Sequence, residues 1–414
     1  MKKKNEPLKQ IDLENLVKGA TFLASGGGGT YDSAMLFVQN FTKKHYERTE
    51  VSIIDVDDIP ENDSKCAIVL AYLGTPTKLK DAVTPDAAIQ SVNTIQEELK
   101  KRGKELGYIV PIEVGGISTL VSCLVGAKLN LTVINADGAG RAVPLLQMTT
   151  FATHGADVNP CVLTNSSDYK IVYEVSDSRE ASASTTIEAL ARSALSMREF
   201  DQVGGITMWT MDRALMSKAI LIKGTITKCI QLGKIIGNEQ YLIKPNISSI
   251  QNVLNTINYH SQIVCQGKIL DAKNTAIGGF DSGLMTIQQD QTPENLIKII
   301  FQNESLIVWD SGQGSPLVTA PDLISYLIIP EATHKRQLVY SNSDIIDPST
   351  QQLKEELKNA EIIVLTMKAP QTLLDQESNL ISSSVLKSFH EVLQNVGYLS
   401  LIHISEPTRR VVIS

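Results

Sequence analysis

Two stretches decide the fold of this chain: Val110-Pro-Ile-Glu-Val-Gly-Gly-Ile-Ser-Thr119 and Leu131-Thr-Val-Ile-Asn-Ala-Asp-Gly-Ala-Gly-Arg-Ala-Val-Pro144. Each is an apolar, β-rich run that stops at a carboxylate and at glycines, and a helical pattern over Thr119–Leu129 joins the two. In an open α/β sheet, ligands bind at the carboxyl ends of the strands. The sequence therefore predicts a site built from Glu113, Gly115, Gly116, Asp137, Gly138 and Arg141.

Strand and helix patterns alternate through the first third of the chain. Strands are predicted at Val51–Val56, Cys66–Leu73, Tyr108–Val114 and Leu131–Ala136, and helices at Ile11–Leu23, Tyr31–Lys44, Thr84–Lys101 and Thr119–Leu129. This alternation is typical of βαβ units with a parallel sheet. Right-handed crossovers bring the strand ends to one edge, so Gly74-Thr75-Pro76 is expected beside Gly115 and Asp137.

The pattern changes from Val158 onward. Strands are predicted at Asn159–Thr164 and Tyr169–Val175, hairpin strands separated by turns over Lys268–Gln289 and Leu296–Trp309, and helices at Thr185–Met197 and Arg213–Ile236. The predicted fold is an α/β N-terminal domain with a mainly parallel sheet (10–167), followed by a β-rich α+β C-terminal domain (168–398). Residues 399–414 read like translated adapter sequence, and we expect a non-native tail there.

Composition narrows the class of protein. The chain has 414 residues, 43% hydrophobic and 20% charged, and a net charge of −7, which argues against a nucleic-acid or membrane-surface binder. It contains neither an apolar run of membrane-spanning length nor a signal-peptide pattern. Five widely spaced cysteines indicate reduced thiols and a cytoplasmic location, and a homo-oligomer stays open.

The four glycines Gly26, Gly27, Gly28 and Gly29 permit two interpretations. They resemble a phosphate cradle, but neither GxxxxGK[ST] nor a strand followed by GxGxxG is present. Because they follow a helical pattern, a helix C-cap with a ligand-covering loop is the alternative. No nucleotide is expected.

Two carboxylates are candidates for acid–base chemistry. Asp137 is a candidate general base or polar anchor, with Arg141 as an electrophilic clamp, although the two residues could instead only organise their loop. Glu113 is a candidate second carboxylate, and its position in a strand would equally suit a pair with a buried arginine.

Metal and nucleophile signals are sparse. His154 is a candidate metal ligand or proton carrier, but a lone histidine is more often a hydrogen-bonded structural residue. Cys123 and Cys161 could join it in space, yet no zinc spacing is present, and Cys123 lies in an apolar helical run that suits an inert thiol. The cofactor is therefore unknown, and a divalent metal stays open. The absence of GxSxG argues against a standard acyl-transfer hydrolase.

A set of short motifs points to a known family. They are Leu23-Ala-Ser-Gly-Gly-Gly-Gly29, Gly74-Thr-Pro76, Pro111-Ile-Glu-Val-Gly-Gly116, Ala136-Asp-Gly-Ala-Gly-Arg-Ala-Val-Pro-Leu-Leu-Gln-Met-Thr-Thr150, Gly267-Lys-Ile-Leu-Asp271, Phe301-Gln-Asn-Glu304 and Ala320-Pro-Asp-Leu-Ile324. In these motifs, over about residues 10 to 330, the chain resembles the S-methyl-thiohydantoin desulfurase family, which occurs near hydantoin-utilisation genes.

The resemblance implies a hydrolase that removes a methylthio group from a small hydantoin-like heterocycle by water attack on a ring carbon. Such a reaction needs a base for the water and donors for the developing charge. Under the resemblance, Asp137 would be the base or a water-orienting carboxylate, and Arg141 the charge stabiliser. The expected substrate-binding residues are Gly26, Gly27, Gly28, Gly29, Gly74, Thr75, Gly115, Gly116, Ser118, Gly138, Gln147 and Asn303, with the backbone N–H groups of Gly115, Gly116 and Gly138 as oxyanion donors.

Three positions depart from the family pattern. Asn135 stands where an aspartate is expected, Ser118 where an asparagine is expected, and Leu145 where Pro-Glu is usual. Each change removes a charge or an amide. The alternative function is therefore a catalytically impaired small-ligand-binding or regulatory protein on the same fold, with nucleotide binding ranked below it.

Overall fold

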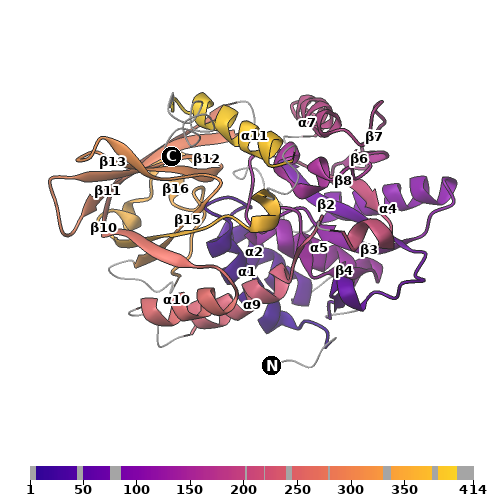
Figure 1. Cartoon of the computed structure of the whole chain (residues 1–414), viewed down its shortest axis with the longest axis horizontal. Coiled ribbons are helices and arrows are strands. Elements are labelled where there is room, and N and C mark those ends of the chain that lie inside the picture. The colour runs from indigo at the N-terminus through magenta and orange to yellow at the C-terminus, as the bar shows by residue number, and fades with distance from the viewer. Residues whose placement is uncertain are drawn as a thin grey trace, which may run out of the picture.

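The computed structural model describes residues 6–43, 50–74, 85–200, 203–218, 220–238, 245–277, 280–329, 337–374 and 381–398. An α/β half and a strand-rich half lie side by side (Figure 1). The predicted tail at 399–414, and Thr75 and Pro76 of the predicted strand-end loop, lie outside the described residues.

A seven-stranded sheet forms the centre of the α/β half as described, in the order β1-β4-β3-β2-β8-β6-β7. Its strands are β1 (Ile53–Ile54), β2 (Cys66–Gly74), β3 (Leu106–Pro111), β4 (Thr132–Ile134), β6 (Cys161–Thr164), β7 (Lys170–Tyr173) and β8 (Val203–Met211). The first four in the order are parallel, and β8, β6 and β7 extend the sheet antiparallel. The predicted α/β domain is confirmed, and its sheet runs on past residue 167 through β7 and β8.

Helices cover both faces of this sheet. One face packs on α1 (Gln10–Leu23), α2 (Tyr31–Lys43), α4 (Asp86–Lys101), α5 (Gly116–Leu129) and α9 (Thr225–Ile236). The other face packs on α6 (Thr150–Thr153) and α7 (Ala181–Leu195), with η2 (Leu146–Met148) beside them. Helix α5 is apolar nearly all round because it lies between the sheet, α1 and α2.

Helices α1 and α9 cross at glycines. A Cβ atom on Gly19 would lie 1.9 Å from the Cys229 carbonyl oxygen, and one on Gly233 would lie 1.8 Å from the Asn15 carbonyl oxygen. The two backbones can approach this closely only because both residues lack a side chain.

The strand-rich half is an antiparallel sheet of nine described strands built on β10 (Ser261–Ile277). The others are β11 (Phe280–Gln289), β12 (Leu296–Gln302), β13 (Glu304–Asp310), β14 (Ser315–Thr319), β15 (Leu323–Ile329), β16 (Ile346–Asp347), β17 (Gln352–Leu353) and β18 (Glu361–Met367). Helices α10 (Ile247–Thr256) and α11 (Ile381–Asn395) flank it (Figure 1). The predicted β-rich second domain is confirmed.

The two halves share a hydrophobic core. Leu323 and Leu327 of β15 belong to the same buried cluster as Leu16 of α1. Ser25 adds two hydrogen bonds with the Ile324 backbone, at 2.9 and 3.2 Å, and so ties the end of α1 to β15. The seam between the halves is therefore packed and hydrogen-bonded.

Two predicted elements are shorter or broken. The single helix expected over Arg213–Ile236 is wrong, because the segment divides into α8 (Arg213–Met216), β9 (Ile222–Lys223) and α9. Gly224 lies between β9 and α9 with a left-handed φ of 79°, where the chain turns into the helix. The strand expected over Val51–Val56 is reduced to β1 and is followed by the 3₁₀ turn η1 (Val56–Asp58).

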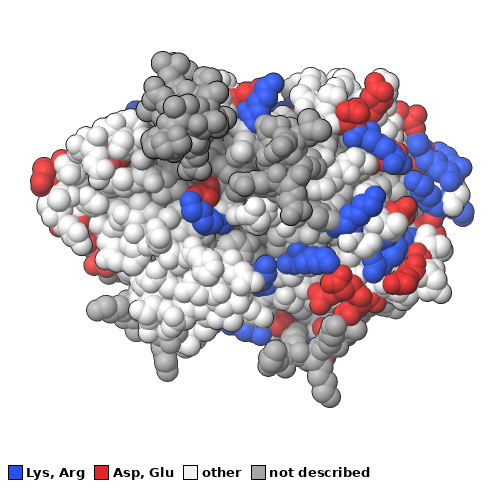
Figure 2. Space-filling model, in the orientation of Figure 1, with Lys and Arg blue, Asp and Glu red and all other residues white. Residues whose placement is uncertain are grey.

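The two halves also differ in the charge of their visible surfaces. Acidic and basic side chains are interspersed over the α/β half, whereas the area over α10 is largely uncharged (Figure 2). Helix α10 indeed contains no Lys, Arg, Asp or Glu. In the described part of the chain, no helix has the length and apolar character needed to cross a bilayer.

Candidate functional site

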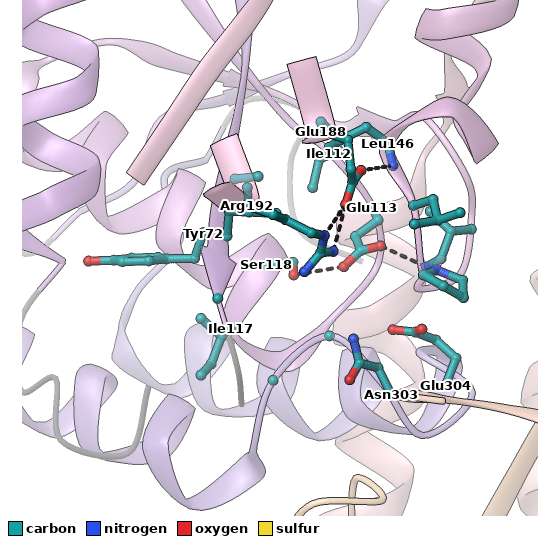
Figure 3. A pocket seen from close by; sticks show the side chains of 18 residues that line it. Tyr72, Ile112, Glu113, Ile117, Ser118, Leu146, Glu188, Arg192, Asn303 and Glu304 are labelled. Atoms are coloured by element: carbon teal, nitrogen blue, oxygen red, sulfur yellow. Dashed lines mark hydrogen bonds and ion pairs between the residues drawn. The ribbon is translucent and has the colours of Figure 1, made fainter. Parts of the chain in front are cut away.

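A cavity of about 90 Å³ lies at the carboxyl ends of β2 and β3, between the two halves. The start of α5 and the glycine loop after α1 form one wall, α7 forms another, and the turn between β12 and β13 closes it from the strand-rich half (Figure 3). Its polar and charged lining includes Glu113, Ser118, Glu188, Arg192, Asn303 and Glu304.

The cavity brings together several residues predicted from the sequence. The lining includes Gly28, Gly29, Gly74, Glu113, Ser118 and Asn303. Leu145, one of the three departures from the family pattern, lines it too. A cavity therefore lies at the carboxyl ends of the strands, where the sequence predicted a site.

Glu113 is buried, and both of its carboxylate oxygens have donors. The Ser118 hydroxyl donates to Oε1 at 3.0 Å, and the Val143 N–H donates to Oε2 at 2.7 Å. Burial raises the pKa of Glu113 to about 7, although these two hydrogen bonds lower it. A carboxylate with this pKa exchanges its proton near neutral pH.

Glu304 is the first residue of β13 and shares the cavity with Glu113 (Figure 3). It is 3% exposed, and no donor among the described residues reaches its Oε2 atom. Burial, and next the charge of Glu113, raise the pKa of Glu304 well above its ordinary value. Its neutral form is therefore favoured.

Arg192 supplies a cation to the cavity. Its Nε atom donates to Glu188 Oε1 at 2.6 Å, and Glu188 Oε2 accepts from the Leu146 N–H at 2.7 Å. The guanidinium carbon also lies 4.1 Å from the centre of the Phe280 ring, at the start of β11. These contacts fix Arg192 between α7 and the strand-rich half.

The four glycines allow close packing. The Gly28 carbonyl accepts from the Ile117 N–H at 2.9 Å, at the first turn of α5. A Cβ atom on Gly28 would lie 2.4 Å from the Gly115 Cα atom, and one on Gly27 would lie 2.1 Å from Glu304 Oε1. The loop is therefore packed closely against α5 and Glu304. Gly26 packs instead on the Asn342 side chain.

Asp137 and Arg141 do not appear among the described residues that line the cavity. Asp137 Oδ1 accepts from the backbone N–H groups of Ala139 and Gly140, each at 2.6 Å, and so organises its own loop. Burial raises the pKa of Asp137 to about 6. The structure thus uses this carboxylate to hold the turn that precedes Val143 in the chain.

Arg141 directs its hydrogen bonds to backbone carbonyls. Its guanidinium donates to the carbonyls of Pro321 and Asp322 at 2.6 and 3.0 Å and to that of Ala142 at 2.9 Å. Burial lowers its pKa to about 10, against the opposing influence of Glu304 and Glu113. Arg141 therefore fastens the two halves together, and its charge acts on both cavity glutamates.

Two of the three expected oxyanion donors are committed elsewhere. The Gly115 N–H donates to Thr119 Oγ1 at 3.1 Å, and the Gly138 N–H donates to the Ile112 carbonyl at 3.1 Å. Gly116 packs against Thr21, whose Oγ1 atom would lie 2.8 Å from an added Cβ atom.

The two predicted amide residues lie in different places. Asn303 lines the cavity, and its side-chain oxygen accepts from the Asp281 N–H at 2.9 Å. Gln147 lies in η2 outside the lining, half-buried, with no donor to its Oε1 atom in the described part of the chain.

The metal candidates stay apart. His154 Nδ1 lies 2.9 Å from the Thr150 carbonyl, at the end of α6. Cys123 and Cys161 are buried thiols whose pKa values burial raises. Among the residues that the structure describes, no three His, Cys, Asp or Glu side chains form a group that could hold a metal ion.

Asn135, the third departure, connects elements away from the cavity. Its Nδ2 atom donates to Asp55 at 2.7 Å and to Thr227 Oγ1 at 3.1 Å, and its Oδ1 atom accepts from the Thr227 N–H at 3.1 Å. An amide can make both kinds of bond, which a carboxylate cannot.

The sequence analysis did not single out Glu188, Arg192 or Glu304. Glu188 and Arg192 form an i, i+4 pair on a helix, which is common on exposed helices and gives no sign of a site. Glu304 ends the quoted Phe301–Glu304 motif, but its nearness to Glu113 arises only when the halves pack.

Comparisons with known proteins cover nearly the whole chain. Residues 11–175 match the family model described as "S-Me-THD-like, N-terminal domain", and residues 182–379 match "S-Me-THD-like, C-terminal domain". A crystal structure of a protein from Chromobacterium violaceum, from a structural genomics consortium, is 29% identical with a TM-score of 0.80, covering 95% of this chain and 98% of that chain. No curated protein matches.

Proposed function

Since the chain belongs to the S-Me-THD-like family, we propose that it hydrolyses a small hydantoin-like heterocycle and removes a methylthio group by water attack on a ring carbon. The observation that carries the proposal is Glu113, a buried carboxylate with two donors and a pKa near 7, in a cavity between the two family domains. A general base works best when its pKa lies near the working pH.

Glu113 is the proposed base for the attacking water. Ser118 and Val143 hold its carboxylate in one orientation, so that its remaining lone pairs can accept the proton of a water in the cavity. Ser118 thus keeps a role at a position where the family pattern led us to expect an asparagine.

Asp137 and Arg141 support this base in the proposed mechanism. Asp137 fixes the turn through Ala139 and Gly140 that leads to Val143. Arg141 places a positive charge behind Glu113 and Glu304 and favours their ionised forms. Both residues would then act through the glutamates, not on the substrate.

The second candidate function is a binding or regulatory protein on the same fold. Leu145 favours it, because this apolar residue lines the cavity where the family pattern has Pro-Glu. A lost carboxylate at that place could leave binding intact while impairing turnover.

The experiment that tests the proposal is thiol release from S-methyl-thiohydantoin derivatives by purified protein, with and without a chelator. We expect release by the wild type, a loss of about 100-fold to 10,000-fold in Glu113→Gln, and no change in the exposed control Glu294→Gln. Loss of thiol release in the presence of the chelator would show that the reaction also needs a metal ion. No release despite ligand-induced thermal stabilisation would favour the binding protein, and stabilisation by ATP, GTP or NAD would favour nucleotide binding.

A further inference from the structure

The turn that carries Glu304 is held rigidly. Asn303 lies between paired residues of β12 and β13 with a left-handed φ of 56°. Its N–H donates to the Asp281 carbonyl at 2.8 Å, and its carbonyl accepts from Asn342 Nδ2 at 2.9 Å. Glu304 follows directly and lines the cavity from the strand-rich half.

Glu304 and Glu113 have opposite surroundings although they share one cavity. Glu113 accepts two hydrogen bonds, which favour its ionised form. Glu304 is 3% exposed, and its Oε2 atom finds no donor among the described residues. Two carboxyl groups in one cavity do not ionise together readily, and Glu113 has two donors where Glu304 Oε2 has none among the described residues, so the negative charge belongs on Glu113 and the proton on Glu304.

The neighbouring cations leave this assignment unchanged. The charged groups that act on Glu304 are Glu113, Arg141 and Arg192. Arg141 donates to backbone carbonyls of Ala142, Pro321 and Asp322. Arg192 donates to Glu188. The hydrogen bonds of both guanidinium groups named here thus go to acceptors other than the Glu304 carboxyl group.

We propose that Glu304 is the general acid that works opposite Glu113, contributed by the second domain; this inference rests on the proposed function. As the water oxygen bonds to the ring carbon, Glu113 takes a water proton and neutral Glu304 gives its proton to the ring nitrogen, which receives the electron pair of the C=N bond. The C–S bond then breaks. Methanethiolate takes the proton from Glu113, and the new hydroxyl returns its proton to Glu304 as the carbonyl forms.

These reaction steps leave both glutamates in their starting protonation states and need only water as co-reactant. Acid and base come from different domains, so the site is complete only in the assembled chain. It also requires a bell-shaped pH dependence: activity rises as Glu113 loses its proton and falls as Glu304 loses its own.

The first test is infrared spectroscopy of the full-length protein at neutral pH. The difference spectrum of wild type against Glu304→Gln should contain the carbonyl stretch of a protonated carboxylic acid, and that of wild type against Glu294→Gln should not. A carboxylate signal in its place would overturn the proposal. This readout is independent of activity.

The second test is the pH dependence of thiol release. The wild type should give a bell, and Glu304→Gln should turn over about 100-fold to 10,000-fold more slowly and lose the alkaline limb. A wild-type profile without an alkaline limb, or unchanged release by Glu304→Gln, overturns the acid role and leaves the proposed function standing. No release by the wild type overturns the proposed function, and the acid role with it.

Discussion

Glu113, Glu188 and Glu304 have the same side chain but different partners. Glu188 is paired with Arg192 and a backbone N–H, Glu113 accepts from a hydroxyl and a backbone N–H, and Glu304 lacks a described donor at Oε2. These partners distinguish a fixed ion pair at Glu188, the proposed base Glu113 and the proposed acid Glu304.

The stability of the chain should report the protonation of Glu113. Its pKa is raised from 4.5 to about 7, so between these values the folded state binds more protons than the unfolded state. The contribution of protonated Glu113 to stability is therefore fully present below pH 4.5 and is lost as the pH rises through 7. From pH 5 to pH 8, the free energy of unfolding of the wild type should fall relative to Glu113→Gln by on the order of 3 kcal/mol, as urea titrations would measure. Parallel pH profiles of the two proteins would contradict this assignment.

Gly27→Ala and Gly28→Ala should separate the orientation of Glu304 from the stability of the loop. The three atoms nearest to a Cβ atom on Gly27 would all belong to the Glu304 side chain, so the substitution should displace that side chain and not the backbone. We expect a folded protein with strongly reduced thiol release. A Cβ atom on Gly28 would meet the Gly115 backbone, and Gly28 also has a φ of +69°, so unfolding free energy should fall by about 2 kcal/mol or more. Normal turnover by Gly27→Ala would show that Glu304 need not hold its position.

Strands and helices near the site were predictable, because their periods are local. The expected strand Cys66–Leu73 and helix Thr84–Lys101 match β2 and α4 closely. The break in Arg213–Ile236 between α8 and α9 was missed, since the apolar spacing continues across it. Glu113 could be found as a strand-end carboxylate. Glu304 could not be paired with it, because their contact depends on the docking of distant elements.

The crossing of α1 and α9 gives a prediction about these elements. Alanine stabilises an exposed helix relative to glycine by about 1 kcal/mol. At Gly233, however, the added Cβ atom would lie 1.8 Å from the Asn15 carbonyl. Gly233→Ala should therefore lower unfolding free energy by about 2–4 kcal/mol. Ile11 of α1 is 58% exposed, so Ile11→Ala should change the free energy of unfolding by less than about 0.5 kcal/mol. Chemical denaturation measures both, and equal effects would argue against the close crossing.

At the scale of the molecule, the candidate cavity and the shared core both lie where the two halves meet. Leu323 and Leu327 of the second domain belong to the core of the first. Ser325 Oγ donates to the Phe22 carbonyl, which adds to the bonds of Ser25. The two family domains thus build one folded unit, and a site between them depends on that unit.

Arg141→Met should therefore weaken the whole molecule. The substitution leaves the carbonyls of Pro321 and Asp322 without their donor and removes the positive charge behind Glu113 and Glu304. We expect the free energy of unfolding to fall by about 3–5 kcal/mol. The acidic limb of the pH–rate profile should also move to higher pH, because Glu113 loses a neighbouring positive charge that lowers its pKa. Arg213→Met is the matched control, since Arg213 donates to the Ile59 carbonyl within the first half.

Calorimetry of the wild type should give one transition, because the core is shared; two separate transitions would mean that the halves unfold independently and that Arg141 does not join them.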